Sequence, residues 1–533
     1  MLYPESSHQL NHQPLQADVS HELMPINRLF SSIIRLRMAN INRMLQSPVE
    51  SQRDVFRELS NGLLKTKFGE EHGFSKFSNS ITIKEFKAQV PIRTYDDIKP
   101  WISRARDGER DVLWTGDVTW FAKTSGTTSD RSKLLPVTKD SLKTCHYKGG
   151  RDLLAMFCDQ RPQAPLYSGK HLIIGGSSSL HPDGSGSYTG DLSAIIVRNL
   201  PPWVEMRRTP GRDITLLEDW EEKVDLMADQ IIHQDVRILA GIPSWMLVVA
   251  DRVLDKTGAN SLDEVWPNLW LYMHGGVGFA PYKSEFKRLI RSPNINYMET
   301  YNASEGFFGI QESLERDDMA LLLDHGIFYE FMPLNEVGNP HPITLDLREL
   351  EVGEEYALVI STNAGLWRYM LGDVIRLTSR NPYRIKVAGR VSSFLNVVGE
   401  ELMVDQVERA ISTTMSKFSI SAKEFTVAPR FAVDGHPIGH TWVIELMTNG
   451  VSTLSEFDIG ETLDKELKSL NSDYDAKRTG DLVLQMPEVH IVESGTFEVW
   501  LKENNKLGGQ HKIPRLSNSR LFLDEILRVI PNQ

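Results

Sequence analysis

The chain has little cysteine and no long hydrophobic run. Its 533 residues include Cys145 and Cys158, which are too few for a disulfide framework and are not spaced as a metal-ligand pair. No apolar stretch approaches the roughly 20 residues that span a bilayer, and the polar first residues lack the cationic start and apolar core of a signal peptide. We therefore expect two unpaired thiols in a reducing compartment, a cytoplasmic location and no membrane partner.

Positive charge is also in deficit. The formal net charge of −12 opposes phosphate backbones, and no block or stripe of lysine and arginine offsets it. The 15 histidines form no HExxH or similar zinc spacing. We therefore expect no nucleic-acid partner and no structural zinc.

What remains is the composition of a folded protein with more than one core. Hydrophobic residues make up 41% of the chain, charged residues 24% and aromatic residues 9%, which a disordered chain would not contain. At about 150 residues per domain, the length predicts about two to four structural units.

The periodicity of apolar residues divides the chain further. Steps of three and four residues predict an amphipathic helix from His21 to about Gln46 and a second one near Val55 to Leu64. Strands then alternate with helices or turn-rich loops, which favours an α/β core with parallel strands. The expected strands are VTWFAKT, HLIIGG, VRILAGIP, LWLYMHGG and YMETY.

After about Asp324 the pattern becomes rich in strands, which predicts a β subdomain attached to the core. Its expected strands are GIFYEFMPL, PITLDL, EYALVIS and PYRIKVAGR. A helix near Glu401 opens a small α+β domain, so we place the joint between Arg390 and Glu400. The predicted division is a polar, disordered segment 1–20, a large domain 21–395 and a small domain 396–533.

The first chemical motif is FAKTSGTTSDRSKLLPVT, residues 121–138, where a strand enters a loop of small hydroxyl and glycine residues that ends at Lys133. Gly126 lets the backbone approach an anion, while the hydroxyls and the lysine can bind phosphate oxygens. The hydroxyl residues are Ser125, Thr127 and Thr128. The motif does not match the GxxxxGK[ST] P-loop. An ordinary Ser/Thr-rich surface loop is the alternative.

The second motif is YMETYNASEGFFGIQ, residues 297–311, in which a turn after a strand places Glu305 beside Ala303 and Ser304. The Glu305 carboxylate could hold Mg²⁺ against phosphate oxygens. Tyr301 could stack on a nucleotide base, although a tyrosine near a strand end is more often part of the core.

The third motif, LWRYMLGDVIRL at residues 366–377, places Asp373 after Gly372. The two oxygens of this carboxylate could accept hydrogen bonds from both hydroxyls of a ribose. A turn aspartate without a ligand is the alternative.

Taken in order, the three motifs resemble a known family, the auxin-responsive or Gretchen Hagen acyl acid amido synthetases. That family belongs to the adenylate-forming superfamily of acyl-CoA synthetases, peptide-synthetase adenylation domains and luciferases. The matching segments read TSGTTSDRSK, YNASE and RYMLGD, and WPNLWLYMHGG and GGQHKIPRLSN also look like family segments. The resemblance extends from about residue 20 to the C-terminus.

The resemblance implies a fold and a set of roles. It implies the two-domain fold of adenylate-forming enzymes, with a mobile small domain, and the use of ATP and Mg²⁺. Asp373 and Arg390 would then bind the ribose, and Glu305 the Mg²⁺. Tyr301, Ala303 and Ser304 would bind the nucleotide. The phosphates would lie against the loop ending in Lys133, and Lys512 would reach the acyl carboxylate and the α-phosphate.

The chain also departs from the plant pattern. One residue more separates Arg368 from Gly372 than in the plant motif, and the joint reads GRVSSFLNVVGEEL. We therefore expect a microbial branch of the family.

The function that the resemblance implies is ATP-dependent activation of a carboxylic acid as an acyl adenylate, followed by transfer to an amine such as an amino acid. Two alternatives stay open. One is an acyl-CoA synthetase, which differs in using a thiol as acceptor, and the other is a nucleotide-binding protein without catalytic activity.

Overall fold

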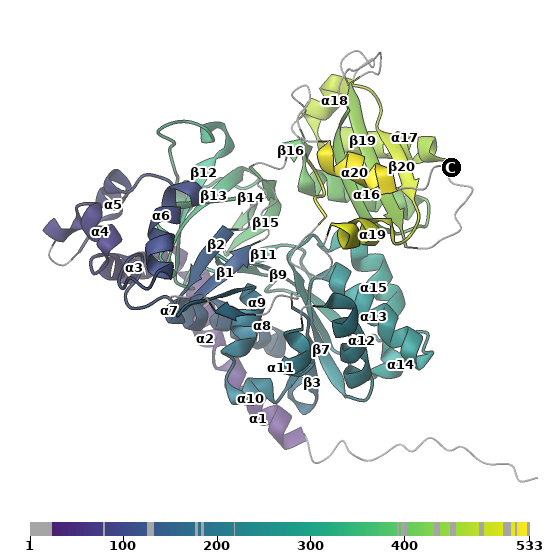
Figure 1. The fold of residues 1–533 in the computed structure, drawn as a ribbon, viewed down its shortest axis with the longest axis horizontal. Coiled ribbons are helices and arrows are strands. Elements are labelled where there is room, and N and C mark those ends of the chain that lie inside the picture. The colour runs from purple at the N-terminus through teal and green to yellow at the C-terminus, as the bar shows by residue number, and fades with distance from the viewer. Residues whose placement is uncertain are drawn as a thin grey trace, which may run out of the picture.

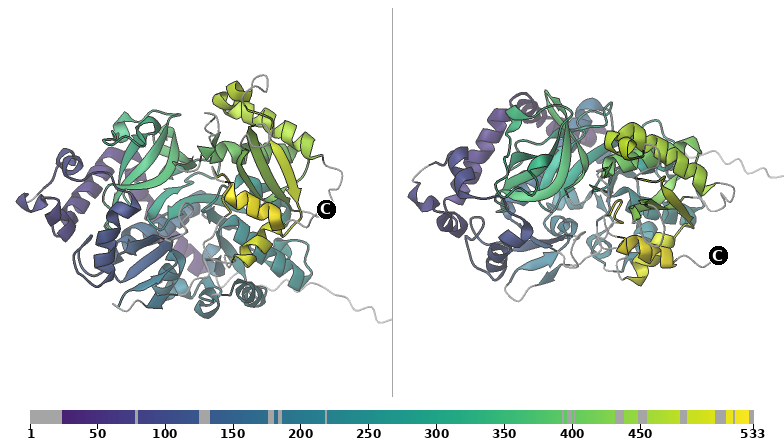
Figure 2. Two further views of the ribbon diagram at one scale, coloured as in Figure 1. Left: turned by 45° about the horizontal axis from the view of Figure 1, so that its top comes forward. Right: turned by 90° about the horizontal axis from the view of Figure 1, so that it is seen from above.

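The computed structural model places the chain in a large body and a smaller one (Figures 1 and 2). It describes residues 24–77, 80–124, 133–175, 180–182, 186–217, 219–391, 394–395, 400, 402–430, 438–447, 455–478, 484–504, 513–517 and 520–529. The large body contains the chain up to about residue 390, and the smaller body, green to yellow in Figure 1, contains the C-terminal part. Among the described residues, no helix combines the length and apolar character that a bilayer crossing requires.

The N-terminal region is helical. It contains α1 (Met24–Arg35), α2 (Met38–Gln46), α3 (Pro48–Leu63), α4 (Lys67–Glu71), the 3₁₀ helix η1 (Phe74–Lys76), α5 (Ile83–Gln89) and α6 (Tyr95–Arg106). The predicted helix from His21 to Gln46 is two helices over its described part, because the amides of Leu36 and Arg37 bond to carbonyls three residues back and Arg37 reaches Asp152 at 2.5 Å. The apolar spacing continues across this break and therefore did not reveal it.

An eleven-stranded sheet forms the centre of the large body, in the order β12-β13-β14-β15-β11-β10-β9-β8-β7-β3-β6. Its parallel part consists of β3 (Lys170–Ile173), β6 (Arg208–Thr209), β7 (Val236–Gly241), β8 (Leu271–Gly275) and β9 (Asn296–Ala303). A buried apolar cluster joins these strands to α12 (Trp220–Ile231), α13 (Pro243–Thr257) and α15 (Lys283–Leu289). The predicted α/β core with parallel strands is confirmed.

The strand-rich region continues the same sheet with antiparallel pairing. Its strands are β10 (Gly306–Ile310), β11 (Met319–Leu321), β12 (Ile327–Pro333), β13 (Glu355–Thr362), β14 (Tyr369–Arg380) and β15 (Tyr383–Arg390). The strand predicted at PITLDL was wrong. Leu345 forms a single bridge with Phe331, and the Asp346 side chain caps the 3₁₀ helix η6 (Leu347–Glu349) instead.

A second sheet of four strands has the order β2-β1-β5-β4. It consists of β1 (Trp120–Thr124), β2 (Lys133–Val137), β4 (His181–Pro182) and β5 (Tyr188–Gly190). We expected VTWFAKT among the parallel strands of the core, but β1 belongs to this second sheet, where it pairs parallel with β5 and antiparallel with its neighbour in sequence, β2. A short connection makes this local pairing easier to close than a distant one.

The remaining helices of the large body connect and cover these sheets. They are α7 (Lys139–Ser141), the π-helix η2 (Leu142–His146), α8 (Tyr147–Gln160), η3 (Leu166–Ser168), α9 (Leu192–Arg198), α10 (Pro202–Glu205), α11 (Arg212–Thr215), α14 (Leu262–Val265), η4 (Ala280–Tyr282) and η5 (Leu334–Glu336). Cys145 and Cys158 lie here, buried and unpaired.

The smaller body has a sheet of three strands in the order β18-β19-β20 and a buried core of its own. Its strands are β18 (Ala422–Arg430), β19 (Gly439–Leu446) and β20 (Glu488–Val492). The helices are α16 (Val404–Lys417), α17 (Glu456–Leu470), α18 (Ser472–Arg478), α19 (Thr496–Glu503) and α20 (Leu521–Val529). The hairpin of β16 (Phe394–Leu395) and β17 (Leu402–Met403) precedes α16. The predicted small α+β unit is confirmed.

Candidate functional site

The YNASE motif forms a tight hairpin between β9 and β10. Ala303 pairs with Gly306, so Ser304 and Glu305 occupy the two turn positions. Gly306 packs closely, since a Cβ there would lie 2.5 Å from Ile327 Cδ1 and the isoleucine side chain would have to shift. The hairpin therefore fixes Glu305 at the end of β9, where ligands of α/β sheets bind.

Asp373 is the centre of a polar cluster beside this hairpin. Tyr301 Oη donates a hydrogen bond to Asp373 Oδ2 at 2.7 Å, and Arg390 Nε donates to Asp373 Oδ1 at 2.8 Å. The pairing of β14 with β15 sets Asp373 directly opposite Arg390. The structure thus brings three of the residues predicted from separate motifs into direct contact.

Tyr301 is buried, and its ring lies 4.8 Å, centroid to centroid, from that of Phe308. Burial, together with the negative charge of Asp373, raises its pKa well above the ordinary tyrosine value, so it stays protonated and donates. Its predicted stacking on a nucleotide base stays a prediction.

The carboxyl group of Glu305 has a raised pKa. Burial and then the nearby negative charge of Asp373 raise its pKa to about 7, although Arg390 and Lys133 oppose the shift. Among the described residues no side chain donates a hydrogen bond to this carboxylate. Its oxygens are therefore available to a hard cation such as Mg²⁺, which prefers carboxylate ligands.

A metal at Glu305 would need further ligands. The described residues hold no cluster of three or more histidine, cysteine, aspartate or glutamate side chains that could bind a metal ion. Mg²⁺ commonly binds through one or two carboxylates together with phosphate oxygens and water. The donor set at Glu305 fits this arrangement.

Lys133 marks the far end of the predicted phosphate loop. It is the first residue of β2 and pairs with Thr124, the last residue of β1, so the strands bring the two ends of the loop together. Its Nζ lies 5.7 Å from the ring centroid of Tyr95, and its charge acts on Glu305. Lys133 therefore lies close enough to Glu305 for the two charges to interact.

Several predicted residues cannot be placed. Ser125, Gly126, Thr127, Thr128 and Lys512 lie outside the described residues, so their roles stay predictions. Ala303 and Ser304 are half-buried members of the hairpin, and none of their contacts tests the proposed role.

Arg368, the arginine of RYMLGD, does not join the cluster. Its guanidinium is buried and donates to both oxygens of Glu330, at 2.9 and 2.8 Å, and to the Val90 carbonyl. Sequence reasoning also missed Tyr95, whose hydroxyl accepts from the Leu134 amide at 3.0 Å. No signal in the sequence connected Tyr95 with Lys133, because the contact depends on where α6 packs.

Chemically, the cluster combines opposite charges. Glu305 and Asp373 supply carboxylates, while Arg390 and Lys133 supply cations. Asp373 has about four acceptor positions on its two oxygens, and the two described hydrogen bonds leave others for hydroxyl donors. The arrangement can hold a polyhydroxyl group, an anion and a hard cation next to one another.

Comparison with known proteins gives matches along most of the chain. Residues 37–295 match the model of the GH3 family N-terminal domain, residues 320–390 that of the GH3 family central domain and residues 405–521 that of the GH3 family C-terminal domain.

Two curated relatives come from Arabidopsis thaliana. The indole-3-acetic acid-amido synthetase GH3.3 is 24% identical over 543 residues, which covers 87% of this chain and 88% of the relative. The 4-substituted benzoates-glutamate ligase GH3.12 is 24% identical over 555 residues, which covers 89% of this chain and 94% of the relative.

Two solved structures have a similar fold. The AtGH3.15 acyl acid amido synthetase in complex with 2,4-DB superposes with a TM-score of 0.77 at 17% identity, over 94% of this chain and 97% of that one. A 2-hydroxyisobutyryl-CoA ligase in the postadenylation state superposes with a TM-score of 0.58 at 12% identity, over 89% of this chain and 90% of that one.

Proposed function

The chain belongs to the GH3 family, and from this membership we propose that it joins a carboxylic acid to the amine of an amino acid at the expense of ATP. The relatives named above are an amido synthetase and a benzoate–glutamate ligase. The observation that carries the proposal is the contact of Tyr301 and Arg390 with Asp373 beside Glu305. It unites residues that are far apart in the sequence.

The reaction has two steps. An oxygen of the substrate carboxylate attacks the α-phosphorus of ATP, the bond to the β-phosphate oxygen breaks, and pyrophosphate leaves. The amine nitrogen then attacks the acyl carbon, AMP leaves with the oxygen of the broken C–O bond, and the nitrogen loses a proton. Both steps move negative charge, so positioning and electrostatic stabilisation contribute most of the catalysis.

The protein residues would bind and orient the nucleotide. Asp373 and Arg390 hold the ribose, and Tyr301, Ala303 and Ser304 bind the nucleotide. Lys133 and the loop residues Ser125, Gly126, Thr127 and Thr128 hold the phosphates. Glu305 holds Mg²⁺, which would neutralise phosphate oxygens when bound. Lys512 reaches the acyl carboxylate and the α-phosphate.

We propose the same domain division as the sequence suggests, with a segment 1–20, a large domain 21–395 and a small mobile domain 396–533. The separate core of the smaller body supports it. Rotation of the small domain would let Lys512 act in the first step and leave space for the amine in the second. Closure would also keep water from the acyl adenylate.

Exchange of labelled pyrophosphate into ATP tests the first step without knowledge of the acceptor. We expect at least one acid of a broad panel to support exchange in the presence of Mg²⁺. Nucleotide binding without exchange for any acid would instead favour the binding-protein alternative.

The acceptor is tested on the same acyl adenylate. We offer CoA and a panel of amino acids in parallel and measure release of AMP with formation of thioester or amide. Amide formation is expected. Thioester formation alone would identify an acyl-CoA synthetase.

A further inference from the structure

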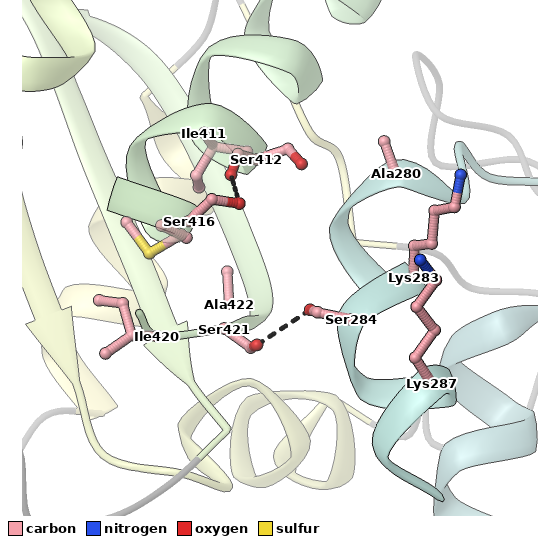
Figure 3. A pocket seen from close by; sticks show the side chains of 11 residues that line it. Ala280, Lys283, Ser284, Lys287, Ile411, Ser412, Ser416, Ile420, Ser421 and Ala422 are labelled. Carbon is pink, nitrogen blue, oxygen red and sulfur yellow. Dashed lines mark hydrogen bonds between the residues drawn. The ribbon is translucent and has the colours of Figure 1, made fainter. Parts of the chain in front are cut away.

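A groove of about 250 Å³ lies between the two bodies, and the proposed reaction does not use it. Its wall on the large body carries Lys283, Ser284 and Lys287, and its opposite wall carries Ser412 and Ser416 of α16 (Figure 3). Ser284 and Ser421 join the walls through a hydrogen bond of 3.1 Å between their hydroxyls. We propose that this groove binds a small phosphate-bearing anion that bridges the two domains.

The two lysines are the main reason. They stand four residues apart on α15, and their side chains extend in the same direction along the helix (Figure 3). Like charges at this spacing repel each other. Both lysines are exposed, and within the described part of the chain neither forms an ion pair. Arg288 on the same helix is paired with Glu285. An anion in the groove would relieve the repulsion between the two ammonium groups.

Hydroxyl groups complete the donor set from the other wall. The Ser412 side chain projects from α16 toward α15 (Figure 3), and no described residue forms a hydrogen bond with its hydroxyl. Ser416 Oγ donates to the Ser412 carbonyl at 2.8 Å and lies beside it. Two ammonium groups and a free hydroxyl match an anion with several acceptor oxygens and more than one charge. Lysine is a common phosphate ligand of this kind, acting as a point charge.

The size of the groove limits the ligand. Its volume of about 250 Å³ suits a phosphate or a small phosphate ester. Because the donors come from both bodies, bound anion would favour the domain arrangement seen here over any arrangement that separates the walls.

The test measures binding of inorganic phosphate by titration calorimetry at constant ionic strength, with a non-hydrolysable ATP analogue present to fill the nucleotide site. Three proteins are compared: wild type, Lys283→Gln/Lys287→Gln, and a control with equal charge change at exposed lysines elsewhere, Lys84→Gln/Lys99→Gln. We expect the groove variant to bind phosphate at least tenfold more weakly than the other two. Equal affinity in all three, or no saturable binding to wild type, would overturn the proposal.

Two further arms locate the ligand more closely. Ser412→Ala should weaken phosphate binding severalfold, whereas wild-type affinity in this variant would overturn the bridging role of α16.

Pyrophosphate and AMP are titrated in parallel, and groove-dependent binding of either one identifies a product of the proposed reaction as the source of the anion. Groove-dependent binding of inorganic phosphate alone identifies a different phosphate source. Pyrophosphate exchange in the groove variant reports on the proposed function separately, since neither lysine belongs to the nucleotide site.

Discussion

At the scale of single residues, Asp373 joins the two halves of the candidate site. Its side chain is 10% exposed and already accepts from Tyr301 and Arg390. These partners orient the carboxylate, while the remaining lone pairs can accept from ribose hydroxyls. The residue is therefore both a ligand candidate and the support for its neighbours.

Asp373→Ala should weaken the binding of ATP by about 1–3 kcal/mol, because the charge-assisted hydrogen bonds from the ribose hydroxyls are lost. This corresponds to an increase of about 5- to 150-fold in the KM for ATP. The measurement is steady-state kinetics with a folded variant, checked by circular dichroism. Asp373→Asn keeps an acceptor for Tyr301 and should lose less. An unchanged ATP affinity in Asp373→Ala would remove the residue from the site.

Glu305 should make magnesium binding depend on pH. Its pKa is raised to about 7, so the carboxyl is mostly protonated below pH 7 and ionised above it. A bound cation requires the ionised form, and the proton competes with it. Affinity for Mg²⁺ at a fixed ATP concentration should therefore fall as pH decreases from 8 to 6, by up to about tenfold per unit below the pKa.

The measurement is a Mg²⁺ titration of nucleotide binding at several pH values, with Glu305→Gln as the control. Protonation of ATP itself affects both proteins alike, so the difference between them isolates the carboxyl. Parallel pH profiles in the two proteins would exclude Glu305 as the cation ligand.

Strand pairing sets Asp373 opposite Arg390, and the charge of Asp373 acts on Glu305. The sequence singled out these three residues, and their roles toward a ligand stay predictions. It allowed for Tyr301 as a core residue but could not predict its contact with Phe308, nor that Lys133 lies over Tyr95. Both contacts depend on packing between elements distant in sequence.

At the scale of elements, the pair of Arg368 and Glu330 fixes β14 to β12 across the intervening strand. Arg368 has a left-handed backbone, with φ of 46°, and its guanidinium is directed into the protein instead of toward the nucleotide site. The extra residue between Arg368 and Gly372 is consistent with this separation. The arginine of the motif is thus a structural residue in this chain.

Arg368→Met should destabilise the protein by about 3–5 kcal/mol, because it leaves the buried Glu330 carboxylate without its main partner. Lys87, with Nζ 3.3 Å from Glu330 Oε2, offsets part of the loss. Urea unfolding measures the change, and Arg368→Met/Glu330→Gln should recover a large part of it. A large rise in the KM for ATP without loss of stability would instead place Arg368 in the site.

Prediction of elements succeeded where periodicity and length agreed and failed where a local contact ended an element. The parallel strands were visible as short apolar runs bounded by turns. The break between α1 and α2 and the missing strand at PITLDL were not visible, because capping by Asp346 and the contact of Arg37 with Asp152 override the apolar pattern.

At the scale of the whole molecule, the two bodies meet through a buried polar contact. Tyr282 Oη of the large body donates to Glu424 Oε1 at 3.0 Å, and Arg515 donates to Glu424 Oε2 at 2.6 Å and to the Tyr282 hydroxyl. The Arg515 guanidinium also lies 4.5 Å from the ring centroid of Phe425. This contact, together with the Arg376–Asp405 pair at 3.1 Å, holds the present arrangement of the domains.

Arg515 belongs to the same segment of this sequence as Lys512, GGQHKIPRLSN. Its backbone carbonyl accepts from the Val427 amide at 3.0 Å, and the Ser517 amide donates to the Val427 carbonyl at 3.0 Å. The segment that follows Lys512 is therefore attached to β18, while the Arg515 side chain reaches the large body. Substitutions at Lys512 and at Arg515 should both affect catalysis that depends on rotation of the small domain, but in different ways.

Lys512→Ala should slow formation of the acyl adenylate by orders of magnitude, since a cation lost from a closed, low-dielectric site costs several kcal/mol of transition-state stabilisation. Transfer from preformed acyl adenylate should suffer far less.

Arg515→Ala leaves Glu424 without its cation and should weaken the present domain arrangement. The rates of the two half-reactions should therefore change by unequal factors, even though Arg515 is not proposed to touch the substrate. Both half-reactions are measured separately in each folded variant. Equal losses in the two steps for Lys512→Ala would contradict domain alternation, and equal losses for Arg515→Ala would reduce the buried contact to a purely structural role.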